Sequence, residues 1–135
     1  MRQKELRTAL VCYGGISLAV YMHGVTKELW HATRASRAFH CPQTNTASGV
    51  EAVYLRLLKE IAETRELRLR LLPDIISGAS AGGINGVFLA QAIATGQSLE
   101  PLTAMWLERA DIDVLLDPDA KPWGRFAKFW AQPLV

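Results

Sequence analysis

Cysteine and histidine are scarce in this sequence, which has two cysteines and three histidines, none of them after position 41. Cys12 and Cys41 are not spaced like zinc ligands, and a disulfide-dense secreted domain needs more than two cysteines, so reduced thiols are expected. Lysine and arginine form no cluster with interleaved aromatic residues, and the net charge is only +2. The sequence therefore does not indicate a protein that binds nucleic acid.

Two long segments, Thr8–Thr26 and Ile75–Leu99, lack charged residues altogether. The first follows a basic start, like a signal peptide, but Gly14-Gly15 interrupts it and no small-x-small cleavage site follows. The second is long enough to cross a membrane but is too rich in glycine, serine and asparagine. We therefore expect a cytoplasmic, soluble protein whose only membrane contact is peripheral.

The length of 135 residues suits one domain, and the sequence is half apolar and 21% charged, which argues against disorder. Short apolar runs that end near glycine predict two buried strands, at Thr8–Tyr13 and Pro73–Ser77. Apolar residues at three- and four-residue intervals predict helices from Ser17 to about Ala35, behind a capping box at Ser48–Glu51, over Gly82–Thr95 and after Ser98.

The remaining segments are expected to connect these elements. Met1–Arg7 is predicted to be a polar lead-in, Phe39–Ala47 a loop, and Thr64–Arg70 either a helix end or an extension of the next strand. Asp111–Asp119 is acidic, and Trp123–Val135 is typical of the start of another helix.

Strands that alternate with helices predict an α/β fold with a parallel pair of strands joined by a right-handed crossover. A parallel sheet needs more than two strands, and the pattern stops part-way. We therefore expect residues 1–135 to be the N-terminal part of one larger domain.

The sequence Gly78-Ala79-Ser80-Ala81-Gly82 joins the second predicted strand to an apolar helix. This order is the context of a nucleophile elbow, in which a serine sits on a strained turn at the N-terminus of a helix. The simplest alternative is a glycine-rich turn whose serine only caps the helix. No Lys-Ser or Lys-Thr pair follows, as a phosphate-binding P-loop requires, and the glycines do not match a dinucleotide site. Ser80 is therefore the candidate nucleophile.

A second glycine-rich turn, Tyr13-Gly14-Gly15-Ile16-Ser17, follows the first predicted strand. Its backbone N–H groups are suited to bind an oxyanion. Taken alone, the glycines are better explained by a simple tight turn, but the pairing with the Ser80 elbow favours the oxyanion-binding interpretation. Parallel strands end at the same edge of a sheet, so this turn is expected to lie near Ser80.

No histidine follows Ser80, so the common hydrolase order of serine, acid and histidine is absent from this chain. His23, His31 and His40 all precede it, and each is expected to be a partly exposed helix or loop residue rather than a base or a ligand.

These two motifs, separated by about sixty residues, resemble those of the patatin-like phospholipases, and in particular bacterial patatin-related proteins. The resemblance implies a three-layer α/β/α fold with a parallel central sheet, lipid acyl hydrolase activity and a Ser–Asp dyad without histidine. It implies that Ser80 is the nucleophile, that Gly14, Gly15, Ile16 and Ala81 supply oxyanion-hole N–H groups, and that Gly78 and Gly82 shape the elbow. It implies a lipid substrate, transient contact with a membrane surface, and no metal or cofactor.

The sequence departs from the family pattern at two places. The usual loop is Asp-Gly-Gly-Gly-x-Arg-Gly, whereas Cys12 and Tyr13 replace the aspartate and first glycine, and Ser17 replaces the arginine. The dyad aspartate normally lies in an Asp-Gly motif, which this sequence lacks. Asp111, Asp113, Asp117 and Asp119 are expected to be solvated turn residues. This chain alone should therefore be inactive, and a non-catalytic lipid- or protein-binding module is the alternative.

Overall fold

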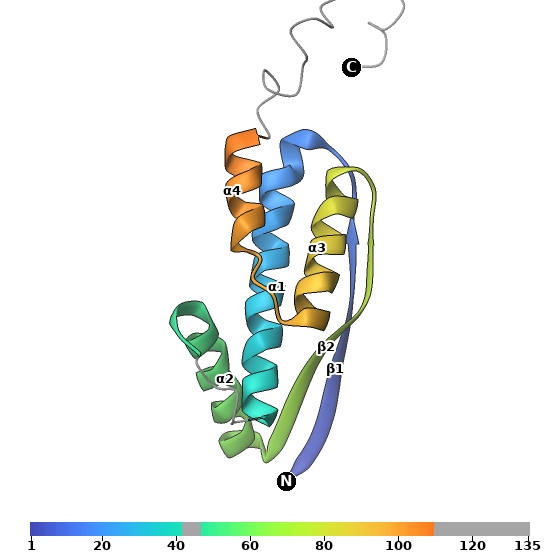
Figure 1. The fold of residues 1–135 in the computed structure, drawn as a ribbon. Helices are drawn as coiled ribbons and strands as arrows, with labels where there is room; N and C mark the ends of the chain where they lie inside the picture. The colour runs from blue at the N-terminus through green and yellow to red at the C-terminus, as the bar shows by residue number, and fades with distance from the viewer. Residues whose placement is uncertain (42–46, 110–135) are drawn as a thin grey trace, which may run out of the picture.

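The structure, a computed structural model, describes residues 1–41 and 47–109. Two strands and four helices are defined in this part of the chain (Figure 1). In chain order they are β1 (Arg2–Cys12), the 3-10 turn η1 (Ile16–Leu18), α1 (Ala19–His40), α2 (Gly49–Arg65), β2 (Leu67–Gly78), α3 (Ala81–Thr95) and α4 (Glu100–Arg109).

The two strands pair in parallel, as the alternation of strands and helices predicted. Pairing runs from Arg2 opposite Leu67 to Cys12 opposite Gly78. The register shifts between Thr8 and Ala9, where Asp74 is an extra residue in β2. Despite this β-bulge, both strands end side by side, so the glycine turn after β1 and the elbow after β2 begin at the same edge of the sheet.

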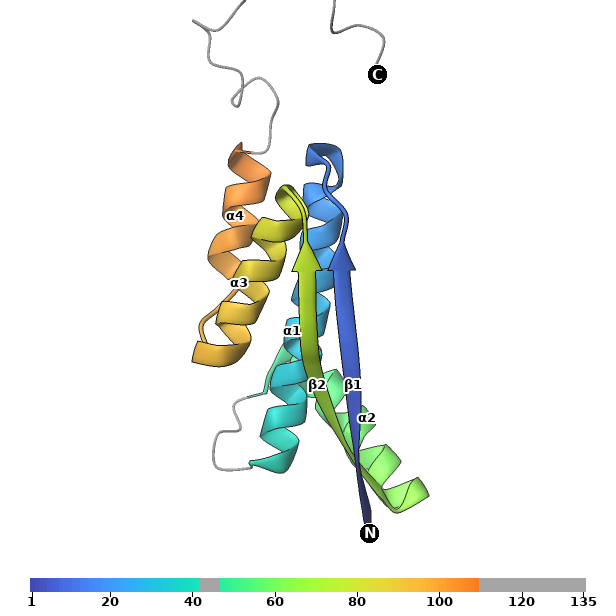
Figure 2. The ribbon, with the colours of Figure 1, turned by 90° about the vertical axis from the view of Figure 1, so that its right-hand side faces the viewer.

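The helices cover one face of the described sheet (Figures 1 and 2). Cys12 and Leu10 of β1 belong to the helix-side core, whereas Val11 is 57% exposed and Ile75 of β2 is 60% exposed. This alternation is the period-two pattern of a sheet with one covered face. The α/β arrangement is thus observed, with one helical layer among the described residues.

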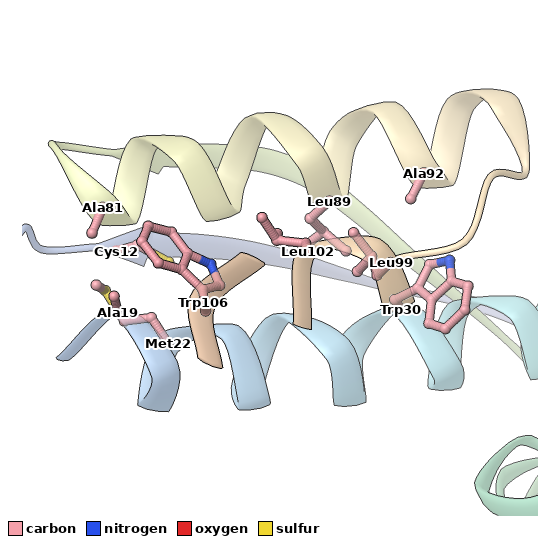
Figure 3. Close-up of a cluster of buried hydrophobic side chains, with 10 residues drawn as sticks. All are labelled: Cys12, Ala19, Met22, Trp30, Ala81, Leu89, Ala92, Leu99, Leu102 and Trp106. Atoms are coloured by element: carbon pink, nitrogen blue, oxygen red, sulfur yellow. The ribbon is translucent and has the colours of Figure 1, made fainter. Parts of the chain in front are cut away.

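The core lies between α1, α3 and α4, and it contains the end of β1 (Figure 3). Its larger members are Trp30 of α1, Leu89 of α3, Leu99 just before α4, and Leu102 and Trp106 of α4. Figure 3 shows Trp106 at the end of the cluster that holds Cys12, Ala19 and Ala81. Packing in this core fixes the starts of α1 and α3 relative to each other.

The strands extend further towards their N-termini than the apolar runs indicated. Met1–Arg7 was predicted to be a polar lead-in, but β1 begins at Arg2, and Leu67–Arg70 extends β2. The polar residues are tolerated because one face is solvent-exposed and carries ion pairs from Arg7 to Glu5 at 2.8 Å and to Asp74 at 2.9 Å. Parallel pairing with the partner strand, rather than local hydrophobicity, sets the length of these strands.

Two helix boundaries also differ from the predictions. Ser17 does not cap α1, because it lies within η1 and the N-cap residue is Leu18, while α1 continues to His40 instead of ending near Ala35. Ser48 is the N-cap of α2, as expected, but its side chain makes no capping hydrogen bond. The Glu51 carboxylate instead accepts a hydrogen bond from Arg34 Nε of α1 at 2.6 Å. A contact between helices has replaced the predicted capping box.

The elements around the elbow match the predictions closely. Gly96 ends α3 with a φ of 78°, and the Ser98 hydroxyl accepts a hydrogen bond from the Glu100 N–H at 3.1 Å at the start of α4. The predictions for Asp111–Asp119 and for Trp123–Val135 lie outside the described residues.

Candidate active site

Ser80 occupies a strained backbone conformation between β2 and α3. Its φ is 51° and its ψ is −128°, a combination that side-chain-bearing residues rarely adopt. The flanking glycines are required by close packing, because a Cβ atom on Gly78 would lie 2.5 Å from the backbone carbonyl group of Gly82. The turn is therefore as tight as a nucleophile elbow requires.

The Ser80 hydroxyl is not used to cap the helix. Ser80 is exposed and is the N-cap residue of α3, but its side chain makes no capping hydrogen bond. Ala81 is the first residue of α3, and its N–H is among those that have no carbonyl partner within the helix. An accessible hydroxyl thus stands at the positive end of the helix dipole, where negative charge is stabilised.

The end of β1 holds the elbow in place. The Ala79 N–H donates to the Cys12 carbonyl at 3.2 Å, and Gly82 packs so closely on that carbonyl group that any Cβ atom would clash. Burial raises the pKa of the Cys12 thiol, which favours its neutral form at the core end of this contact. Cys12 thus supports the elbow through its backbone carbonyl, a role that does not depend on its side chain.

The glycine turn lies directly against the elbow. A Cβ atom on Gly14 would be 3.0 Å from the Ala79 carbonyl oxygen and 3.1 Å from Ser80 Cβ. Gly15 has a φ of +133°, which favours glycine, and its carbonyl accepts a hydrogen bond from the Leu18 N–H at 3.2 Å. The structure therefore brings together the two motifs that are about sixty residues apart in the sequence, with Ile16 opening η1 beside them.

The histidines take structural positions, but one of the sequence predictions is wrong. His31 and His40 are half-buried, and they contact Glu51 and the Leu69 carbonyl respectively. His23 was expected to be partly exposed, yet it is only 3% exposed, because α4 packs over it and Thr103 Oγ1 lies 2.7 Å from its Nε2. A contact with a helix eighty residues later is not visible in the local pattern of α1.

The aspartate of a dyad is not among the described residues at the elbow. Asp74, the one aspartate in the described ranges, is paired with Arg7 on the exposed face, roughly 13 Å of strand before Gly78. Asp111, Asp113, Asp117 and Asp119 lie outside the described residues. Within residues 1–41 and 47–109, no group of three or more histidine, cysteine or acidic side chains is placed to hold a metal ion.

The sequence predictions missed Asn85, which is completely buried in α3. Its side-chain nitrogen donates to the Ala19 carbonyl at 3.2 Å, and its side-chain oxygen accepts from the Trp106 indole N–H at 2.9 Å. The available signal was its position as the one polar side chain between Gly82 and Ala90. A lone amide in an apolar helix needs buried partners.

Comparison with known proteins identifies the family of this chain. A family model described as patatin-like phospholipase matches residues 10–133, and the chain therefore belongs to that family. The mixed α/β fold with its parallel strands is consistent with part of a patatin-like α/β/α fold.

One curated relative is a Mycobacterium tuberculosis protein named as the uncharacterized membrane protein Rv3479. It is 35% identical over 123 residues, which cover 87% of this chain but only 11% of the relative. The chain thus corresponds to a small part of that protein. No solved structure matches the chain. Among the described helices, none has both the length and the apolar character needed to cross a membrane.

Proposed function

We propose that the full-length protein hydrolyses carboxyl esters of phospholipids or other lipids through an acyl intermediate on Ser80. The observation that carries this proposal is the conformation of Ser80, an exposed and uncapped hydroxyl on a strained turn at the start of α3. A serine that only capped the helix would accept a hydrogen bond from the first turn and would not need positive φ. Membership of the patatin-like family supports the same chemistry.

In the proposed reaction, Ser80 Oγ forms a bond to the ester carbonyl carbon while its proton passes to a general base. The carbonyl oxygen becomes negatively charged and binds to N–H groups of Gly14, Gly15, Ile16 and Ala81. The C–O bond to the alcohol then breaks, and the alcohol leaves with the proton. Water attacks the acyl-Ser80 ester in the same way and releases the fatty acid.

The general base in this proposal is an aspartate beyond residue 135, which would complete a Ser–Asp dyad. Asp74 is unsuited to the role because its carboxylate is engaged by Arg7. Residues 1–135 alone should therefore show at most the residual rate that remains when a base is removed.

Exposed apolar side chains beside the glycine turn support a lipid substrate and a transient contact with a membrane surface. Tyr13 is 81% exposed, Tyr21 is 71% exposed, and Leu18 is 49% exposed. They lie within Thr8–Thr26, which has no charged residue. Tyrosine is well suited to a membrane–water interface because its ring is apolar and its hydroxyl is polar.

A fluorophosphonate probe on the full-length protein tests the nucleophile directly. The wild-type protein should be labelled, Ser80→Ala should lose the label, and Ser77→Ala should retain it. Ser77 is the matched control because it is also exposed and is the next serine towards the N-terminus, at the end of β2.

Equal labelling of the wild type and Ser80→Ala would contradict the proposal and favour the non-catalytic binding module. The same variants, assayed with phospholipid in vesicles and with a soluble p-nitrophenyl ester, test the lipid preference. A protein that hydrolyses the soluble ester but gains nothing from vesicle presentation would not support contact with a membrane.

A further inference from the structure

The only buried amide on α3 connects the two turns of the candidate site. Asn85 is completely buried, and it lies one helical turn after Ala81, the first residue of the helix that begins at the elbow. Its Nδ2 group donates to the carbonyl of Ala19, the first residue of α1. Ala19 directly follows η1 and the glycine turn. The amide therefore bridges the starts of the two helices that carry the oxyanion-binding turn and the nucleophile.

Trp106 of α4 fixes the orientation of this amide. The indole N–H donates to Asn85 Oδ1 at 2.9 Å, and Trp106 itself is 93% buried in the core. An amide has one accepting end and one donating end, so the bond from Trp106 directs the NH₂ group towards Ala19. Reversing the amide would place two donors, or two acceptors, against each other in a buried site, which is costly.

We propose that Asn85 is a positioning residue for the acyl-transfer reaction, an inference that rests on the proposed function. It holds the glycine turn in register with Ser80 through the Ala19 carbonyl, and Trp106 holds Asn85. The reason is geometric: oxyanion donors must lie about 2.7–3.1 Å from the oxygen that becomes charged, so a displacement of a few tenths of an ångström weakens them. Gly14 already approaches Ser80 closely, since a Cβ atom on Gly14 would be 3.1 Å from Ser80 Cβ. A purely structural asparagine would affect stability alone.

The test compares the rate of fluorophosphonate labelling in the full-length protein, because the phosphonyl oxygen must enter the same oxyanion site. Asn85→Leu retains similar volume but removes both hydrogen bonds, and it should slow labelling about tenfold to a hundredfold while still reaching full stoichiometry. Trp106→Phe keeps an aromatic ring without the N–H donor and should slow labelling by a smaller factor, about threefold to tenfold. With a p-nitrophenyl ester, Asn85→Leu should lower kcat and leave KM nearly unchanged.

Leu89→Ala is the matched control for stability. Leu89 lies one turn further along α3, is completely buried, and belongs to the apolar core. Its truncation should lower the melting temperature through a cavity, yet leave the labelling rate within about twofold at temperatures well below unfolding. The double variant Asn85→Leu/Trp106→Phe should be labelled no more slowly than Asn85→Leu, because both substitutions break the same connection from Trp106 through Asn85 to Ala19.

The inference is overturned if Asn85→Leu labels at the wild-type rate, if Leu89→Ala slows labelling equally, or if the two losses multiply in the double variant. If Asn85→Leu does not fold, a wild-type rate for Trp106→Phe overturns it. These outcomes differ from failure of the proposed function, in which Ser80→Ala itself is labelled like the wild type.

Discussion

Gly14 illustrates how one hydrogen atom in place of a methyl group shapes this site. The replacement Gly14→Ala would place a Cβ atom 3.0 Å from the Ala79 carbonyl oxygen and 3.1 Å from Ser80 Cβ. The turn or the elbow must then shift by a few tenths of an ångström. We predict that fluorophosphonate labelling of Ser80 slows about tenfold or more, while the free energy of unfolding falls by only about 1–3 kcal/mol.

Gly24→Ala is the control for this substitution. Gly24 lies inside α1, and a Cβ atom there would meet nothing within 4 Å. The alanine should therefore raise the free energy of unfolding by about 0.5–1 kcal/mol and leave labelling unchanged. A wild-type labelling rate in Gly14→Ala, measured at a temperature where the variant is fully folded, would contradict the close approach of the two turns.

The sequence was sufficient to predict the local geometry around Ser80, because glycine spacing and the change from strand to helix are encoded within a dozen residues. It was insufficient for His23 and Asn85. Both are polar side chains whose burial depends on α4, a helix that comes later in the sequence and packs on them through Thr103 and Trp106. Local periodicity identifies which residues can form a helix, but not which later helix covers them.

The contact between α1 and α4 contains a buried histidine with an incomplete set of hydrogen bonds. His23 Nε2 contacts Thr103, whereas its Nδ1 is buried without a hydrogen-bond partner. Burial lowers the pKa of His23 below its usual value near 6.5, and the nearby Lys27 ammonium lowers it further, while the Asn85 amide and the Glu100 carboxylate oppose this shift. The folded protein therefore favours neutral His23.

A lowered pKa makes the docking of α4 sensitive to acid. The unfolded or detached state binds the proton more readily, so the stability from neutral His23 is complete above about pH 6.5 and is lost as the pH falls towards the lowered pKa. We predict that hydrogen-exchange protection factors in α4 fall between pH 7.5 and pH 5.5. The decrease should be smaller in His23→Gln, which does not titrate.

His40→Gln serves as the control in this comparison, since His40 contacts β2 rather than α4. Its α4 peptides should respond to pH as those of the wild type do. If His23→Gln also shows the wild-type loss of protection, another group controls the acid response of the contact.

The strands show the same division between local and distant information. Their apolar parts, Thr8–Tyr13 and Pro73–Ser77, were predicted to be buried strands because they are short apolar runs that end near glycine. Both segments lie in the strands up to Cys12 and Ser77, but one face is exposed, as Val11 and Ile75 show. Of the polar ends, Arg2–Arg7 was assigned to a polar lead-in, and Leu67–Arg70 was left undecided between a helix end and an extension of the strand. Their strand conformation depends on pairing with each other, and residues more than sixty positions apart give no periodic signal.

Across the described molecule, the two faces of the sheet are unequal. The helices cover one face (Figure 2). The other face carries the exposed side chains of Val11 and Ile75 together with the ion pairs of Arg7. An α/β sheet of this kind is ordinarily covered on both faces. The expectation that residues 1–135 form part of a larger domain is compatible with this face, and it stays a prediction.

The bulge in β2 determines where the protein can change in length. Asp74 is the extra residue between Pro73, which pairs with Thr8, and Ile75, which pairs with Ala9. Deletion of Asp74 would make these pairs consecutive and would leave Cys12 opposite Gly78, at the cost of an exposed ion pair that contributes little. Deletion of Ile76 would instead move Gly78 by one position and turn the following side chains to the opposite face.

We therefore predict that the protein lacking Asp74 is still labelled at Ser80, whereas the protein lacking Ile76 is not, as measured with the fluorophosphonate probe. Labelling in both, or in neither, would contradict the register. Related chains could then differ by one residue in this strand and still place the serine at the same point, provided that the difference falls at the bulge.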